Sequence, residues 1–182
     1  RVLELLTTHR VDGELGRIVE IGLQHEQQHQ ELLLTDVKHL YASCGSDPAY
    51  RNAPLPRDNR STDPGFVGFD GGLTSIGHAG VGFAFDNEMP RPKVYVGPFA
   101  LCRRLVMNSE FAAFIDDGGY GEAALWSDDG WAWRNRENVN SPLYWRGEPG
   151  SWSEFRLDGL CALGPDLPVT HVSWYEADAF AR

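Results

Sequence analysis

The most informative stretch of this sequence reads His25-Glu26-Gln27-Gln28-His29-Gln30-Glu31. It lies inside a run without proline that has helical periodicity from about Glu14 to Ser43. Side chains four positions apart in a helix lie on the same face, about one turn apart. His25 and His29 can therefore reach one metal ion from a rigid scaffold. The alternative is a chance pair, in which both rings have ordinary structural roles.

The rest of this helical face favours the metal. One side of the expected helix is mainly apolar and carries Ile18, Ile21, Gly22, His25, Gln28, His29 and Leu32. A buried polar side chain without a partner costs about 1–3 kcal/mol, and a metal ion would satisfy both imidazoles at once. We therefore expect a buried face with a metal site at His25 and His29. Helices of this length usually belong to a bundle.

The same letters also match a zinc-protease motif. In that interpretation Glu26 is the general base beside a zinc-bound water. The extended form of the motif has a third histidine six positions after His29, where this sequence has Thr35. The segment that follows is rich in proline and short apolar runs, so it offers no second helix with a glutamate ligand. The sequence therefore disfavours zinc proteolysis.

Three further polar residues of the helix are weighed as parts of the site. Glu31 and Asp36 could orient a ligating imidazole as outer carboxylates. We interpret both as solvated or ion-paired side chains, since Glu31 points roughly opposite to His29. His39 shares the face but lies about 15 Å from His29 by helical rise, too far to bind the same ion.

The composition limits the classes of function. The 182 residues carry a net charge of −10 without a cluster of basic residues, so a nucleic-acid partner is not expected. No apolar run approaches 18 residues, so no membrane span is expected. Three widely spaced cysteines (Cys44, Cys102 and Cys161) give neither a disulfide framework nor a zinc pattern, which favours a cytoplasmic location.

The chain changes character after the helix. Residues 45–65 contain four prolines and are interpreted as an extended connector. Short runs punctuated by glycine then predict strands at 66–69, 73–76, 82–85 and 93–96. Two brief helices are expected, one with Asn108 as its N-cap and one that opens with a capping box from Ser173 to Glu176. The tryptophans are expected mainly in the core, and the fold class is α+β.

Several motifs together resemble the ergothioneine-biosynthesis sulfoxide synthases. The helix from Gly22 to His39 is similar to the metal-binding helix of that family almost residue by residue. The later motifs that resemble its second domain are Phe85-Asp86-Asn87-Glu88, Asp117-Gly118-Gly119-Tyr120, Pro142-Leu143-Tyr144-Trp145 and Pro168-Val169-Thr170-His171-Val172-Ser173-Trp174-Tyr175-Glu176-Ala177-Asp178-Ala179. Those later motifs are shared in part with the wider formylglycine-generating-enzyme-like fold.

The resemblance implies a domain order. Residues 1–44 would be the end of a DinB-like four-helix bundle that binds metal, and 45–65 a proline-rich linker. Residues 66–182 would be the N-terminal part of a C-type-lectin-like, formylglycine-generating-enzyme-like domain that is truncated here. The sequence lacks an initial methionine and ends inside a helical pattern, so we expect an internal fragment that is inactive alone.

The resemblance also implies a chemistry. Three histidines would hold one non-haem Fe(II), two of them His25 and His29 and the third on an earlier helix outside this sequence. Gln28 matches a position whose amide approaches the substrate, and the catalytic residues would lie beyond Arg182. The expected substrates are hercynine, O2 and a thiol, either cysteine or γ-glutamylcysteine, which would yield a sulfoxide. The alternatives are a 5-histidylcysteine sulfoxide synthase of the ovothiol pathway and a non-catalytic metal- or ligand-binding module.

Overall fold

The computed structural model describes residues 3–4, 7, 13–52 and 65–182. The chain divides into two compact units. The first unit comprises Arg1–Val37 and Val67–Leu101, and the second comprises Lys38–Phe66 and Cys102–Arg182. Among the described residues, no helix has the length and apolar character needed to cross a bilayer.

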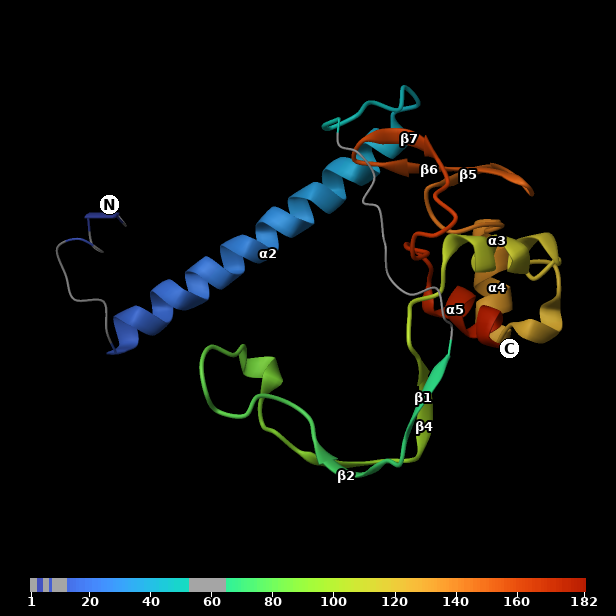
Figure 1. The fold of residues 1–182 in the computed structure, drawn as a ribbon. Helices are drawn as coiled ribbons and strands as arrows, with labels where there is room; N and C mark the ends of the chain where they lie inside the picture. Colours follow the sequence, from blue (N-terminus) through green and yellow to red (C-terminus); the bar gives the residue numbers. More distant parts are fainter. Residues whose placement is uncertain (1–2, 5–6, 8–12, 53–64) are drawn as a thin grey trace. The chain divides into compact units, whose positions relative to one another are not determined.

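Helix α2 (Gly13–Ser43) is the long helix that the periodicity predicts, and it runs without interruption (Figure 1). The prediction of a buried face is wrong for this structure, because none of the residues of α2 is buried. Ile18 and Leu32, the first and last residues of the apolar stripe, are 60% and 57% exposed. The described residues provide no second long helix to cover the stripe, so the expected bundle is not seen among them.

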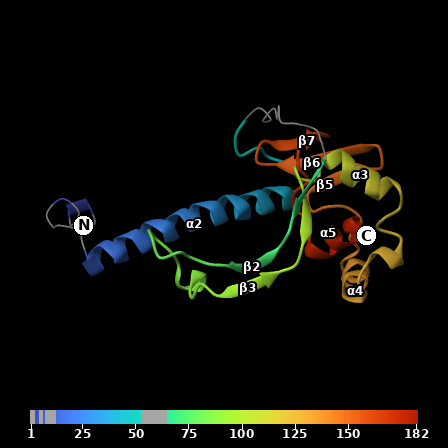
Figure 2. The same ribbon diagram turned by 60° about the horizontal axis from the view of Figure 1, so that its bottom comes forward.

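Two short ladders follow in the chain (Figures 1 and 2). Strand β2 (Gly72–Ser75) pairs antiparallel with β3 (Lys93–Val96), and β1 (Phe66–Phe69) pairs with β4 (Phe99–Cys102). Across the second ladder Phe69 and Phe99 stack with ring centroids 4.8 Å apart. The predicted strands at 66–69 and 93–96 are confirmed, the one at 73–76 begins one residue earlier, and β4 was not predicted.

The strand predicted at 82–85 is wrong. Gly80 and Gly82 have φ values of +91° and +83°, in the left-handed region that favours glycine. The backbone therefore turns where the prediction required extension. Phe83 and Phe85 contact each other edge to face at 4.8 Å instead of facing a neighbouring strand. A single 3₁₀ turn, η1 (Asp86–Glu88), follows directly.

The predicted connector is partly described. Its residues 53–64 lie outside the described residues, so the prediction of an extended linker is untested there. Before them, the backbone N–H groups of Tyr50 and Arg51 donate to the carbonyl of Leu157 at 2.8 and 3.2 Å. Arg146 donates to the Asp47 carboxylate at 2.5 Å. These hydrogen bonds hold the start of the connector against residues 146 and 157 of the same unit.

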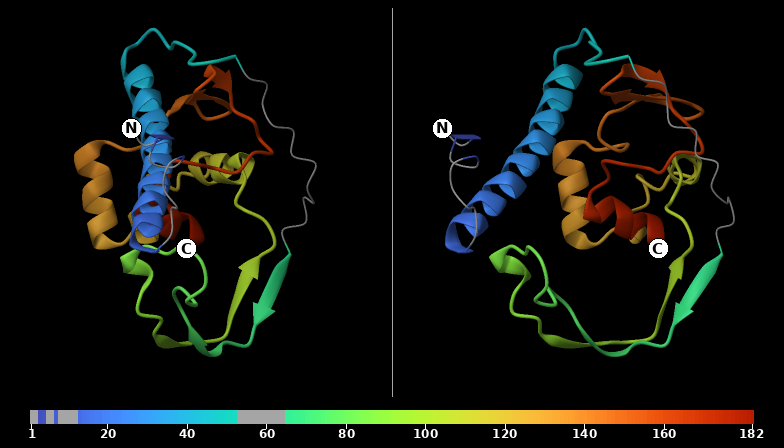
Figure 3. Two further views of the ribbon diagram at one scale, coloured as in Figure 1. Left: turned by 90° about the vertical axis from the view of Figure 1, so that its left-hand side faces the viewer. Right: turned by 60° about the vertical axis from the view of Figure 1, so that its left-hand side comes forward.

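The second unit combines three helices with a small sheet (Figures 2 and 3). The elements in chain order are α3 (Asn108–Asp116), η2 (Ala123–Leu125), α4 (Asp128–Glu137), β5 (Trp145–Glu148), β6 (Ser151–Arg156), β7 (Gly159–Ala162) and α5 (Trp174–Ala181). Strands β5, β6 and β7 form an antiparallel meander in that order. The sheet, the 3₁₀ turn η2 and helix α4 were not predicted from the sequence.

An aromatic core holds the second unit together. Its buried members are Phe111, Tyr120, Trp126, Trp145 and Ala179. Phe111 is 1% exposed and stacks on Phe180 with ring centroids 5.3 Å apart. Burial of a Phe side chain contributes about 1.5–3 kcal/mol, so this cluster supplies a large part of the unit's stability. Trp126 and Trp145 lie in this core as predicted, whereas Trp174 is 69% exposed and lines a cavity together with Trp133.

At the starts of α3 and α5, a glutamate three residues after the N-cap accepts a hydrogen bond from the N-cap N–H. At α5 the predicted capping box is confirmed, since the Ser173 N–H donates to Glu176 and the Glu176 N–H donates to Ser173 Oγ. At α3 the prediction is wrong by one residue, because Met107 is the N-cap. Asn108 instead lies buried and donates its side-chain N–H to the Gly164 carbonyl at 2.9 Å.

Candidate metal centre

The two histidines of the opening motif converge on α2. Nε2 of His25 and Nε2 of His29 lie 2.8 Å apart. Their ring centroids are 4.5 Å apart with 66° between the ring planes. Both side chains are exposed, because no described element covers this part of the helix. The helical repeat alone therefore brings the two ring nitrogens together, as the spacing predicts.

This donor pair fits one first-row metal ion. Metal–nitrogen bonds to imidazole are about 2.0–2.1 Å, so two adjacent ligands of an octahedral ion lie about 3.0 Å apart. The observed 2.8 Å separation of the Nε2 atoms needs only a small rotation of either ring to meet that value. Among the described residues, no cluster of three histidine, cysteine or acidic side chains is placed to hold a metal.

The other polar residues of the predicted site stand apart from this pair. Gln28 is exposed on α2 beside His29, and Glu31 and Asp36 are exposed further along the helix. His39 contacts a different partner, with its Nδ1 3.1 Å from the hydroxyl oxygen of Tyr144. The structure thus brings together His25 and His29 and places His39 in another environment.

A cavity of about 310 Å³ lies in the first unit, and sequence reasoning did not find it. Its polar lining includes Arg17 and Glu20 from α2 and His78 from the loop before η1. Ile21, which also lines it, precedes His25 by one helical turn, about 6 Å along the axis. The volume is at the lower end of the range for small-molecule sites. The glycines around His78, which are Gly77, Gly80 and Gly82, are a sequence signal of a loop at this place.

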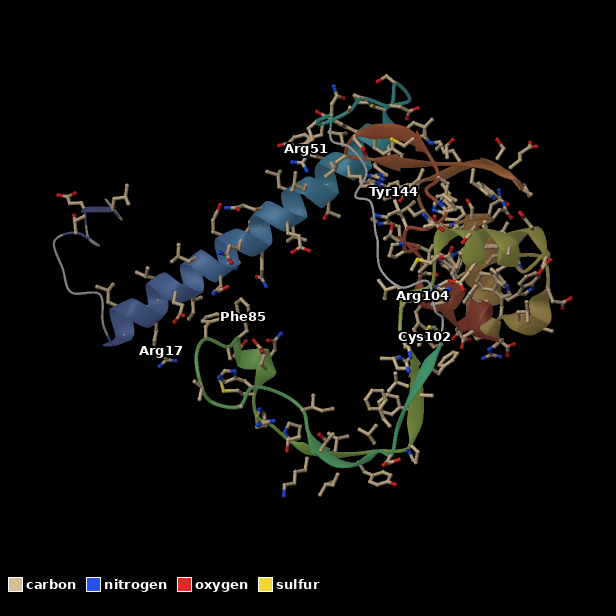
Figure 4. All side chains as sticks on the ribbon, viewed as in Figure 1. Arg17, Arg51, Phe85, Cys102, Arg104 and Tyr144 are labelled. Carbon is tan, nitrogen blue, oxygen red and sulfur yellow. The ribbon has the colours of Figure 1, made fainter. Side chains whose placement is uncertain are left out.

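A second polar cluster lies at the far end of α2, within the second unit. Lys38 Nζ is 2.7 Å from Nε2 of His171 and 4.5 Å from the ring centroid of Tyr144. The Tyr144 and His171 rings meet edge to face at 4.8 Å. Figure 4 shows the Tyr144 side chain beside the last turns of α2. Sequence reasoning missed this cluster because Lys38 and His171 are separated by 133 positions.

The cluster shifts the pKa of its ionisable groups. Burial lowers the pKa of His171, and the neighbouring charge of Lys38 lowers it further. Burial also lowers the pKa of Lys38, while the carboxylate of Glu154 opposes that shift. Burial raises the pKa of the Tyr144 hydroxyl. Neutral side chains are therefore favoured here relative to open solvent.

The sequence places this chain in a known family. Residues 52–182 match the sulfatase-modifying factor enzyme 1-like domain, and the chain therefore belongs to that family. It is also similar to proteins named hercynine oxygenase. It is 34% identical over 168 residues to the one from Mycolicibacterium thermoresistibile, and 34% identical over 184 residues to the one from Mycobacterium tuberculosis. These alignments cover 87% and 98% of this chain.

The similarity extends to a second group of enzymes. The formylglycine-generating enzyme of Streptomyces coelicolor is 30% identical over 162 residues, which covers 78% of this chain and 49% of the relative. The chain spans only 35% and 41% of the two hercynine oxygenases. The resemblance expected from the sequence motifs is thus confirmed, over a part of each relative.

Proposed function

We propose that the protein catalyses oxidative carbon–sulfur bond formation between hercynine and a cysteine-type thiol, dependent on Fe(II) and O2. The imidazole C2–H bond and the thiol S–H bond are lost, and a C–S bond and an S=O bond form. Dioxygen accepts four electrons in total, with one oxygen atom going to sulfur and the other leaving as water. The product is a hercynylcysteine-type sulfoxide.

The observation that carries this proposal is the convergent pair of imidazole nitrogens on α2, 2.8 Å apart. It is supported by the similarity to proteins named hercynine oxygenase, which spans nearly all of this chain. The small cavity one turn before His25 adds space for a small molecule in the same unit. Two neutral imidazoles leave a bound ion its full positive charge, which suits anionic or electron-rich ligands.

The residues then have distinct roles. His25 and His29 hold the iron, and a third histidine comes from another helix of a DinB-like bundle outside residues 1–182. When bound, iron supplies redox chemistry with O2 and coordination positions for the donor atoms of the substrates. Gln28, one residue before His29, contacts the hercynine imidazole through its amide or through a water. Residues 1–44, 45–65 and 66–182 correspond to bundle, linker and second domain.

The reaction is tested by product analysis. The full-length protein is loaded with Fe(II) without oxygen and then given hercynine, O2 and either cysteine or γ-glutamylcysteine. We expect mass spectrometry to detect a sulfoxide adduct with one thiol, and the thiol consumed identifies the donor. An adduct formed only when histidine replaces hercynine would instead support the ovothiol-type reaction. No adduct from iron-loaded protein would leave a non-catalytic binding module as the better interpretation.

The metal site is tested separately from the reaction. His25→Ala and His29→Ala are each expected to lower the affinity for Fe(II) at least about tenfold, because each removes one of the few protein ligands. His39→Ala is the matched control, since it removes a histidine from the same helix and should leave iron content unchanged. Metal content after equilibration with Fe(II) is measured by elemental mass spectrometry. Equal losses in all three variants would mean that the metal face is misassigned.

A further inference from the structure

The sequence contains two lysines, and their surroundings differ sharply. Lys93 is exposed in the β2–β3 ladder of the first unit. Lys38 is half-buried in the second unit, with its Nζ 2.7 Å from His171 Nε2 and 4.5 Å from the centre of the Tyr144 ring. The exposed Lys93 can therefore serve as a reference for the reactivity of the half-buried Lys38.

An imidazole is an uncommon partner for a lysine, and it has a chemical consequence. A carboxylate partner would hold the amine protonated, but Lys38 forms no ion pair with any carboxylate of the described residues. The neutral His171 accepts a hydrogen bond from Lys38 Nζ. Burial lowers the pKa of Lys38 and Arg156 lowers it further, against the opposing charges of Glu154 and Asp158. The free amine of Lys38 is therefore easier to form than that of an exposed lysine.

The backbone fixes this arrangement in advance. Tyr144 has a φ of +76°, which is a strained backbone conformation for a bulky side chain. Its carbonyl accepts the Phe155 N–H at 2.9 Å, and the Leu143 N–H donates to the His171 carbonyl at 3.2 Å. The first bond fixes the Tyr144 segment to β6, and the second joins it to the segment that carries His171. Lys38 is consequently held against a preorganised partner.

We propose that Lys38 is a site of N-acylation by small acyl thioesters, with His171 as the proton acceptor. The Lys38 ammonium first loses one proton to solvent, and the amine lone pair then attacks the thioester carbonyl while His171 Nε2 accepts the second amine proton from the attacking nitrogen. The new C–N bond forms as the C–S bond breaks, and the thiolate leaves with the bonding electron pair. The proton on His171 then passes to the thiolate, so that the products are an amide, a thiol and the proton released to solvent. Nothing is oxidised or reduced.

The modification changes the charge at the end of α2. The amide is neutral and retains one N–H, so it can still donate to His171 but loses its cation–π contact with Tyr144. Acylation would therefore weaken the contact between the last turns of α2 and the Tyr144 segment.

The test compares the two lysines within one molecule. The full-length native protein is treated with S-acetyl-N-acetylcysteamine at mildly alkaline pH, and acetylation of each lysine is followed over time by peptide mass spectrometry. Lys38 is expected to react about fivefold faster than Lys93. In concentrated urea the two rates should become equal, because the advantage depends on the fold. A native Lys38 rate equal to or below that of Lys93 would overturn the proposal.

A matched variant tests the contribution of the His171 imidazole to the Lys38 rate. His171 has a φ of +59°, and asparagine tolerates that conformation, so His171→Asn removes the base while keeping the backbone. The Lys38 rate should fall toward that of Lys93, and the Lys93 rate should stay unchanged. An unchanged Lys38 rate in a variant with native tryptophan fluorescence would exclude His171 as the proton acceptor. The outcome does not depend on iron or on the proposed reaction.

Discussion

Helix α2 and the aromatic core of the second unit show opposite ways of using apolar residues. Leu33 of α2 is 64% exposed, whereas Phe111 and Phe155 are 1% and 0% exposed. The helix is specified by local hydrogen bonds and periodicity, and it carries the paired histidines in a solvent-facing position. The second unit is specified by packing between residues distant in sequence. The paired histidines and the packed core therefore lie in different parts of the chain.

The largest expected effect on this contrast comes from two alanine substitutions, one in the core and one on α2. Phe111→Ala should lower the free energy of unfolding by about 3–5 kcal/mol, because it leaves a cavity in the core. Leu33→Ala should change it by no more than about 0.5 kcal/mol, because the side chain is exposed. Denaturant unfolding followed by tryptophan fluorescence is suitable, since all six tryptophans lie in the second unit. Similar losses in both variants would mean that α2 is packed as tightly as the core.

A smaller effect is expected from one buried hydrogen bond. The Tyr120 hydroxyl donates to Glu176 at 2.5 Å, and Glu176 is 2% exposed. Tyr120→Phe leaves that carboxylate oxygen without its buried donor and should destabilise the unit by about 1–3 kcal/mol. Tyr50→Phe is the control, because the Tyr50 side chain is exposed and should be neutral within about 0.5 kcal/mol. The same fluorescence measurement compares them, and equal values would contradict the role given to the Tyr120 hydroxyl.

The features predicted from the sequence are those that local rules determine. The 3.6-residue period predicts α2 and the convergence of His25 with His29, and both are found. The Ser173–Glu176 capping box was also predicted, because its two hydrogen bonds form within four consecutive residues.

The features that were missed depend on distant contacts or on backbone conformations that residue type alone does not specify. Strand β5 consists of Trp145-Arg146-Gly147-Glu148, a segment without apolar alternation. It is a strand because it pairs with β6. The Lys38–His171 contact joins residues 133 positions apart. The positive φ of Tyr144 is not expected for a tyrosine. The apolar pattern of α2 predicted a buried face, but no residue of α2 is buried.

The smallest expected effect concerns pH and the half-buried His171. Its pKa is lowered from 6.5 by burial first and by Lys38 second, so the folded state binds fewer protons than the unfolded state in this range. Stability should therefore be complete above about pH 6.5 and fall as the pH drops below that value. Protonation places a second cation beside Lys38, 2.7 Å away, and breaks the hydrogen bond. The loss should be smaller than that of Tyr120→Phe.

Thermal unfolding at about pH 7 and about pH 5 measures this slope, and His171→Asn supplies the reference. The variant has no imidazole to protonate, so its melting temperature should fall less than that of the natural protein over the same interval. The tryptophan signal keeps the comparison within the second unit, away from the exposed histidines of α2. An identical fall in both proteins would mean that acid acts elsewhere and that the contact with Lys38 does not contribute to the stability of the second unit.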